Sequence, residues 1–225
     1  MGTNYSPRIV TDGLVLCLDA GDIKSYSGSG ATWNDRSGNE SDATLYNSPT
    51  FTTNNGGSLN FDGSNDYGKT SSTTILNSSA YTKIAWFRPQ GIARNIISGG
   101  GDSQHAFWMG ATNHTLYAGH NGAWQSTVAY RPNASGDMVD EWWCGAVTFN
   151  TTTGWVLYMN GEQVDTDTSN TTANTGNGII RIGAYSDAAN LFNGDINIVQ
   201  VYNRVLTADE IVQNFNAQKG RFNLT

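Results

Sequence analysis

The stretch that decides the fold runs from Asp35 to Tyr67 and contains DRSGNESDATL at 35–45 and LNFDGSNDY at 59–67. In both pieces, turns made of Asp, Asn, Ser and Gly stand next to short apolar runs. Side chains of these types bond to their own backbone in tight turns, and their oxygens also suit a hard cation such as calcium. The stretch therefore predicts a β-sandwich built for surface recognition rather than a catalytic cleft.

The composition agrees with one all-β domain. The chain has 225 residues, of which 26 are Gly and only 14% are charged. Polar turns between many short strands give such a composition, and all-β folds of this length often form a single domain. We expect one domain over residues 1–225, with residues 1–12 as an extended N-terminal arm.

Charge and hydropathy exclude several classes of partner. The formal net charge is −7 and the sequence pI is about 4.7, with no run of basic residues. Nucleic acids and anionic lipids need clustered Lys and Arg, so neither is expected as a partner. No apolar run is long enough to span a membrane, and the N-terminus has no signal-peptide pattern. Cys17 and Cys144 lie in apolar runs and favour buried free thiols, although one disulfide stays open.

Strand patterns recur along most of the chain. Tyr81–Arg88 alternates so that Thr82, Ile84 and Trp86 share one face and Tyr81, Lys83, Ala85 and Phe87 share the other. Trp142–Phe149 is an apolar run bounded by turn residues, which suits a central strand covered on both faces. Residues 20–57 are expected to be mostly turn and loop. The other expected strands are Leu14–Asp19, Ser58–Phe61, Asn95–Ser98, Phe107–Gly110, Leu116–His120, Trp155–Met159, Gln163–Asp165, Ile179–Gly183 and Phe192–Tyr202.

Two local signals fix a hairpin and a helix. Asn160-Gly161 between strand-like runs predicts a tight β-hairpin, because both residues tolerate positive φ. Thr207 and Glu210 form a capping box ahead of an apolar stripe, and the helix is expected to end near Gly220. A short helix after the last strand is expected to plug an edge or end of the sandwich.

Six motifs in this order resemble the concanavalin A-like lectin/glucanase superfamily, in its laminin-G-like branch. The resemblance implies an all-β, two-sheet antiparallel jelly-roll sandwich, sometimes with one structural calcium, and similar domains are common in tailed-phage structural proteins. At Asn197 the family commonly has an acidic residue, which puts a calcium role there in doubt. The motifs are GLVLCLDAG at 13–21, WNDRSGN at 33–39, LNFDGSNDY at 59–67, YTKIAWFRP at 81–89, WVLYMNGEQV at 155–164 and INIVQVYNRVLTADEI at 196–211.

The sequence does not indicate an enzyme. Hydrolases of this superfamily carry two Glu flanking an Asp at alternate positions of one strand, and this chain has no such pattern. Its four Glu residues are dispersed, and Asp165 and Asp167 are expected in an exposed loop. His105, His114 and His120 lack acidic or Cys partners at ligand-like spacing, which favours ordinary loop or strand-end histidines.

One loop has cation-like spacing. Asp35, Ser37, Asn39 and Asp42 fall at i, i+2, i+4 and i+7, and a tight loop could bring these oxygens onto a calcium ion. The alternative is a self-bonded Asx turn. Asp62 with Asp66, and Asp19 with Asp22, form two further candidates that have the same alternative.

Aromatic residues in the Gly- and Asn-rich region 100–131 suggest a glycan surface. The flat rings of Trp108, Tyr117, Trp124 and Tyr130, together with His120, could contact sugar rings while polar neighbours supply hydrogen bonds. The alternative is that these aromatics cap the ends of the sandwich or line an oligomer interface.

The resemblance and the residues together favour a non-catalytic, lectin-like structural module at the surface of a virus or phage particle, made in the host cytoplasm. Its expected partners are a glycan or other virion proteins, and a homo-oligomer is possible. The runner-up is a homo-oligomeric capsid or tail assembly or decoration protein without a sugar ligand. A polysaccharide hydrolase is third.

Overall fold

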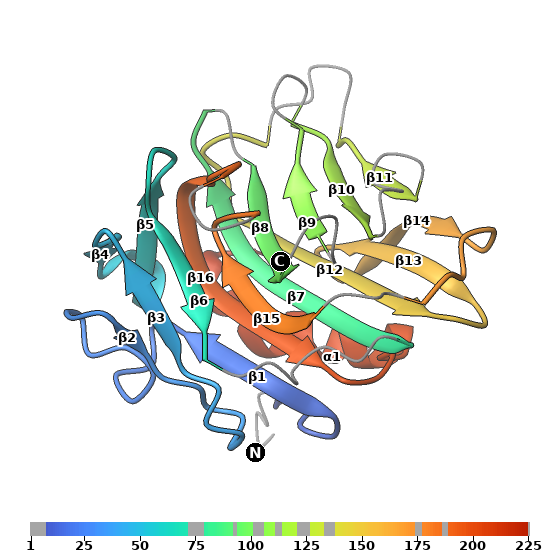
Figure 1. The fold of residues 1–225 in the computed structure, drawn as a ribbon, viewed down its shortest axis with the longest axis horizontal. Helices are drawn as coiled ribbons and strands as arrows, with labels where there is room; N and C mark the ends of the chain where they lie inside the picture. The colour runs from blue at the N-terminus through green and yellow to red at the C-terminus, as the bar shows by residue number, and fades with distance from the viewer. Residues whose placement is uncertain are drawn as a thin grey trace, which may run out of the picture.

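The computed structural model describes residues 8–71, 79–91, 94–100, 106–110, 114–120, 127–132, 138–173, 177–185 and 189–224. Across this part of the chain, two antiparallel eight-stranded sheets pack face to face, and one α-helix lies outside them (Figure 1). The expected jelly-roll sandwich with a short C-terminal helix is therefore confirmed. Within the same residues, no helix is long and apolar enough to cross a membrane.

The first sheet, called sheet A, has the order β14-β13-β12-β7-β16-β5-β4, and β1 (Leu14–Asp19) pairs with β16 beside β5. The partner along one side of β16 changes from β5 to β1 at Asn197. The other strands of sheet A are β4 (Thr50–Thr52), β5 (Ser58–Asp62), β7 (Ala80–Pro89), β12 (Trp143–Asn150), β13 (Gly154–Met159), β14 (Glu162–Asp167) and β16 (Asn193–Tyr202).

The second sheet, called sheet B, lies in front of sheet A in Figure 1 and has the order β11-β10-β9-β8-β15-β6-β3-β2. Three of the described strands, β2, β3 and β4, fall in 20–57, where mostly turn and loop was expected; β6 and β11 were also missed. The strands of sheet B are β2 (Thr32–Trp33), β3 (Ala43–Tyr46), β6 (Tyr67–Thr70), β8 (Asn95–Gly100), β9 (Ala106–Met109), β10 (Leu116–Gly119), β11 (Val128–Tyr130) and β15 (Asn177–Ile182).

The main core lies between the sheets, and a second apolar cluster lies on the outer side of sheet A. The expected alternation of β7 is confirmed: Tyr81 and Phe87 point into the main core, whereas Ile84 and Trp86 point outward. Strand β12 is covered on both faces, as predicted. Cys17 and Cys144 are buried free thiols.

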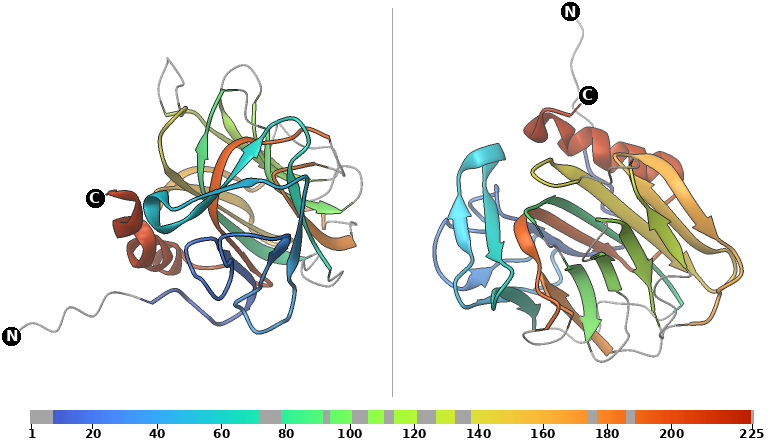
Figure 2. Two further views of the ribbon diagram at one scale, coloured as in Figure 1. Left: turned by 90° about the vertical axis from the view of Figure 1, so that its left-hand side faces the viewer. Right: turned by 90° about the horizontal axis from the view of Figure 1, so that it is seen from above.

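The helix α1 (Ala208–Gln218) begins with the predicted capping box and continues into the 3-10 turn η2 (Lys219–Phe222). It does not plug an edge or end: the views of Figure 2 show it lying across the outer face of sheet A. The reason is the apolar outer cluster of that sheet. There the ring of Trp86 stacks on Phe215 and Phe222, with centroids 5.7 and 4.1 Å apart.

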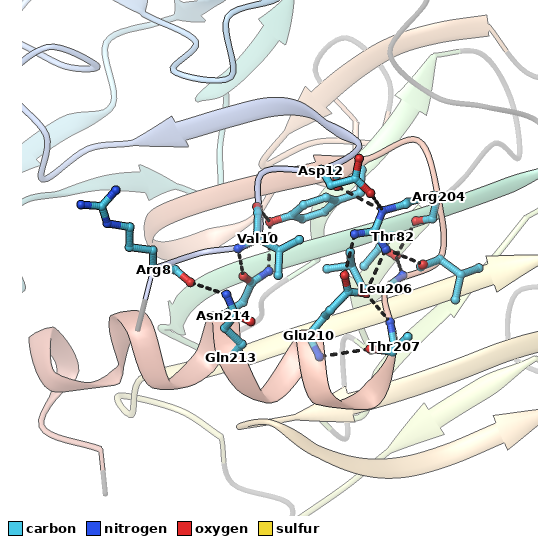
Figure 3. A network of polar contacts seen from close by, with 12 residues as sticks. Arg8, Val10, Asp12, Thr82, Arg204, Leu206, Thr207, Glu210, Gln213 and Asn214 are labelled. Atoms are coloured by element: carbon cyan, nitrogen blue, oxygen red, sulfur yellow. Dashed lines mark hydrogen bonds and ion pairs between the residues drawn. The ribbon is translucent and has the colours of Figure 1, made fainter. Parts of the chain in front are cut away.

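The described part of the N-terminal arm runs along this helix (Figure 3). The backbone N–H of Val10 donates to Oδ1 of Asn214 at 2.7 Å, and the Tyr202 hydroxyl donates to the Val10 carbonyl at 2.9 Å. Gln213 donates to the carbonyl of Arg8 at 2.7 Å. Residues 8–12 therefore close over α1, and the outer face of sheet A is covered by helix and arm together.

The hairpin at Asn160-Gly161 is also confirmed. Asn160 and Gly161 have φ of 50° and 84°, and they join the paired strands β13 and β14. The Asn160 side chain accepts a hydrogen bond from the Cys144 backbone N–H at 2.9 Å, which ties the turn to β12.

Candidate functional site

The outer face of sheet B carries a stacked pair of aromatic rings. Trp108 on β9 lies opposite Tyr117 on β10 in the strand register, with ring centroids 5.3 Å apart and planes at 22°. Their neighbours Phe107, Met109 and Leu116 are fully buried in the core. Because side chains alternate along a strand, the two rings stand on the outside, where both are half-buried.

An amide acceptor lies beside this ring pair. Asn95 on β8 is opposite Trp108 in the register and is only 5% exposed. Its Nδ2 donates weakly to the carbonyl of Asn190 at 3.5 Å, while its Oδ1 has no hydrogen-bond partner among the residues that the structure describes. A buried acceptor without a donor is costly, so this oxygen gains from any hydroxyl that reaches it.

A second stacked pair stands on the same face, nearer the β2 edge. Tyr46 on β3 and Tyr67 on β6 are opposite in the register, with centroids 4.5 Å apart and planes at 6°. Tyr46 is one of the most exposed large hydrophobic residues described, at 39%. Lys69 follows Tyr67 on β6 and lies opposite Arg181 on β15, which is only 8% exposed, so the same face also carries cationic side chains.

Two of the other predicted glycan residues do not lie on this face. Tyr130 on β11 is opposite Leu116 and packs against the main core, so its ring lies on the inner side of the sheet. His120 is fully buried, with its ring 4.5 Å from that of Phe149, which corrects its assignment to a sugar-binding surface. Trp124 lies outside the described residues, and so does His105.

The His120 ring is held inside the sandwich by two hydrogen bonds. Its Nε2 is 2.7 Å from the carbonyl oxygen of Thr172, which can only accept, so Nε2 carries the proton. Its Nδ1 then accepts from the Tyr81 hydroxyl at 3.2 Å. Burial lowers the pKa of His120 to about 4, so this histidine is neutral and structural at neutral pH.

A lysine is buried in the same part of the core. Lys83 on β7 shares its inward face with Tyr81, is 0% exposed, and places Nζ 5.6 Å from the centre of the Tyr81 ring. Nζ has no hydrogen-bond partner in the described part of the chain. Burial holds the pKa of Lys83 well below the ordinary value for lysine. The alternation of β7 placed this residue on the buried face, but nothing in the sequence marked it as unpaired.

The predicted cation loop is held by its own hydrogen bonds. Oδ1 of Asp35 accepts from the backbone of Cys17 and Ser37 at 2.8 and 2.9 Å, and its Oδ2 accepts from the Ser37 hydroxyl at 2.6 Å. Oδ1 of Asp42 accepts from the Asp35 N–H at 2.8 Å, and Asn39 donates to Ser37 Oγ at 2.9 Å. These contacts are those of the self-bonded alternative. A structural calcium here stays a prediction; equal melting midpoints with calcium and with a chelator would remove it.

The other acidic candidates are engaged in the same way. Oδ1 of Asp62 accepts from three backbone N–H groups of its own turn, and the first of these contacts lowers its pKa most. Asp19 forms an ion pair with Arg221 at 2.6 Å. Within the described ranges, no group of three or more His, Cys, Asp or Glu residues could hold a metal ion.

Asn197 is a buried amide whose donors and acceptor are all engaged. It is fully buried, and its Nδ2 donates to the backbone carbonyls of Asn55 and Gly57. Its Oδ1 accepts from Arg221 at 2.9 Å. A carboxylate could accept from Arg221 but could not donate to either carbonyl. The side chain therefore joins β16, the η1 turn (Asn54–Gly56) and η2.

The four Glu residues and the remaining acidic candidates lie in different surroundings. Glu40, Glu141 and Glu162 are exposed at separate places, and Glu210 belongs to the helix cap. Asp165 and Asp167 lie in β14, not in the loop that was expected, because this run extends the edge strand of sheet A. The most buried acid, Asp195, is bonded by Arg88 Nε at 2.8 Å and by Asn60 at 3.0 Å.

The family model described as the concanavalin A-like lectin/glucanases superfamily, in its laminin G form, matches residues 62–212. The chain belongs to this superfamily. No curated protein matches the sequence.

Several solved structures have a similar fold, among them binding domains of botulinum neurotoxins. The binding domain of botulinum neurotoxin DC, solved with rat synaptotagmin II, has a TM-score of 0.72 and 14% identity over 93% of this chain. A botulinum neurotoxin type C structure, whose title describes interaction with two ganglioside molecules, has a TM-score of 0.71 and 13% identity over 92% of this chain. The binding domain of Paraclostridial Mosquitocidal Protein 1 has a TM-score of 0.70 and 15% identity over 92% of this chain. This superfamily member spans 52% of each of those chains.

Proposed function

We propose that this protein is a non-catalytic, lectin-like module that binds glycans through the outer face of sheet B. The observation that carries the proposal is the Trp108–Tyr117 ring pair, held in strand register on a face that α1 does not cover. Sugar rings present patches of C–H bonds that pack on flat aromatic faces, and their hydroxyls pair with amide and charged groups. Asn95, Lys69 and Arg181 supply such groups on the same face.

The toxin domains with this fold support the proposal. The titles of two of their structures mention a ganglioside or a sialylated ligand, and a third names a protein receptor. Those ligands belong to the toxins, of which this chain spans about half. For this chain they favour attachment to a cell surface as the general task, with a glycan as the ligand.

The absence of catalysis is part of the proposal. The superfamily includes glucanases by its own description. Their retaining chemistry needs two carboxyls about 5 Å apart. Of the acids described above, Glu40, Glu141 and Glu162 are exposed at separate places, Glu210 caps a helix, Asp35 and Asp62 close turns, and Asp19 and Asp195 pair with arginines. Turnover of a β-glucan that Glu141→Gln abolishes would overturn this part.

We further propose that the module is displayed on the surface of a virus or phage particle, having been made in the host cytoplasm. The support is the order of the six motifs, which is similar to that of domains in tailed-phage structural proteins. Capsid, tail or portal genes next to the gene for this protein would support this assignment. A neighbourhood of secreted toxin or metabolic genes would contradict it.

A glycan array tests the ligand class. Trp108→Ala and Tyr117→Ala should each weaken binding about tenfold, because each removes a ring from the stacked pair. Val212→Ala is the matched control, since Val212 is exposed on α1 at the opposite side of the molecule and should leave binding unchanged. Circular dichroism of each variant shows that it is folded. Binding to no sugar, or equal binding by all variants, would contradict the proposal.

A further inference from the structure

We infer that a pocket at the edge of the sandwich, separate from the ring pairs of sheet B, binds one neutral pyranose ring. The pocket lies between the loop 26–31 and the turn that joins β3 to β4, and has a volume of about 410 Å³. It lies in the size range of small-ligand sites. Because β3 belongs to sheet B and β4 to sheet A, the pocket opens where the chain passes from one sheet to the other.

One wall of the pocket is aromatic and fixed in place. The rings of Tyr26 and Phe51 lie 5.4 Å apart at 53°, and Leu45 completes this wall. Tyr26 is only 4% exposed, and its hydroxyl donates to the carbonyl of Gly30 at 3.0 Å. A pre-positioned aromatic wall suits the C–H face of a sugar ring and needs little reordering on binding.

The rim of the pocket is polar and uncharged. Ser29 and Ser48 line it, and among the described residues neither hydroxyl has a hydrogen-bond partner. None of the residues that line the pocket is charged. An apolar wall with neutral hydroxyls opposite it matches a neutral sugar better than a charged ligand, whose desolvation nothing here would offset.

Two residues other than glycine next to the pocket have a left-handed backbone conformation. Asn47 and Ser48 both have positive φ, of 62° and 72°, directly before Pro49. Asn47 is fixed there by donating to the carbonyl of Asn65 at 2.7 Å. Such backbone is costly for residues other than glycine and gathers at ligand sites. At Gly28, with φ of 89°, an added Cβ would lie 3.4 Å from the Phe51 ring, so glycine keeps this side of the pocket open.

The sequence offers a closely matched pair of variants. Ala31 lines the pocket, and its carbonyl accepts from the Leu45 N–H at 2.7 Å. Thr32 follows it, is exposed, and lies opposite Thr44 in the register. Ala31→Phe fills the pocket from its rim, whereas Thr32→Phe adds the same ring at the next residue, the first of β2, which does not line the pocket. Both positions are exposed, so neither variant disturbs the core.

The test is an NMR titration of the ¹⁵N-labelled protein with methyl α-D-glucopyranoside, methyl β-D-galactopyranoside and N-acetylglucosamine. At least one sugar should shift the amide signals of residues 26–31 and 45–51, with a millimolar Kd as is usual for one sugar ring. Ala31→Phe should abolish these shifts, while Thr32→Phe and Trp108→Ala should keep them. Shifts that persist in Ala31→Phe, or shifts given only by toluene as an apolar probe, would overturn the inference.

The same titration separates this site from the one on sheet B. If the Trp108–Tyr117 surface does not bind glycans, the NMR shifts at the pocket should still be seen, because Trp108→Ala changes nothing near residues 26–31. Failure of the pocket inference gives no shift at 26–31 or 45–51 with any of the three sugars, whatever the array result.

Discussion

The carboxylate of Asp165 on β14 accepts a hydrogen bond from the backbone N–H of Ala129 on β11, with Oδ2 and N 2.7 Å apart. These strands are the edges of the two sheets. One side chain therefore closes the sandwich at this edge and satisfies a backbone donor of an edge strand. Ala129 lies opposite Tyr117 in the register, so the contact also positions the strand beside the candidate glycan surface.

Removing this contact should loosen the edge. Asp165→Ala should lower the free energy of unfolding by about 1–3 kcal/mol, since a charge-assisted hydrogen bond is lost and a backbone donor is left unpaired. Asp167→Ala is the control, because its carboxylate bonds only within its own turn, to Ser169. Urea denaturation of both variants measures the difference. Equal losses would show that the bridge does not hold the sheets together.

Lys83 should cost stability rather than add to it. Its amine is buried without a hydrogen bond, so Lys83→Met should raise the free energy of unfolding at pH 7 by about 1–3 kcal/mol. Because burial lowers the pKa of Lys83 in the folded chain, the unfolded chain holds this proton up to a higher pH, so wild-type stability should rise with pH towards 10.5. In Lys83→Met, the increase of the free energy of unfolding with pH that Lys83 causes should be absent. The exposed Lys24→Met is the control, and a loss of stability in Lys83→Met would contradict this account.

His120 should make the fold sensitive to acid. Its pKa is about 4 when folded and 6.5 in the ordinary state, so its contribution is complete above pH 6.5 and falls as the pH drops from 6.5 towards 4. The loss between pH 6.5 and 4.5 should be about 2–3 kcal/mol. Denaturation experiments across this range should show that the free energy of unfolding depends less on pH in His120→Gln than in wild type. The same pH dependence in both proteins would contradict this prediction, because it would mean that protonation of His120 does not destabilise the fold.

Asn197→Asp tests why the amide replaces the family's acid. The variant loses two donors and sets a carboxylate against the carbonyls of Asn55 and Gly57, so stability should fall by about 2–4 kcal/mol. Asn203→Asp, at an exposed position, should change little and is the control. Thermal melts in the presence of a chelator compare the two. A variant as stable as wild type would show that the hydrogen bonds donated by Asn197 Nδ2 do not contribute to stability.

The architecture could be predicted because local patterns and tertiary packing agree in most strands. Alternation through β7, the capping box at Thr207 and the Asn160-Gly161 turn each have one clear local solution. The strands β2, β3 and β4 were missed because they have two to four residues and exist only through pairing across the sheets. The helix was assigned to an edge because its partner, the apolar outer face of sheet A, is assembled from strands far apart in sequence.

The candidate site was only partly predictable for a related reason. Trp108 and Tyr117 were identified by composition, and the strand register decides that they share one outer face. Tyr130 and His120 have the same composition around them, but one-residue alternation turns Tyr130 to the core, and His120 finds partners in Tyr81 and Thr172. Tyr46 and the pocket at Tyr26 arise from contacts between distant segments, which no local pattern signals.

The crystal structure of this protein with the glycan that binds best on the array tests the central claim most directly. The account predicts a sugar ring against the Trp108–Tyr117 pair on the outer face of sheet B, within hydrogen-bonding reach of polar groups of that face. A glycan held elsewhere, with this face bare, would contradict it.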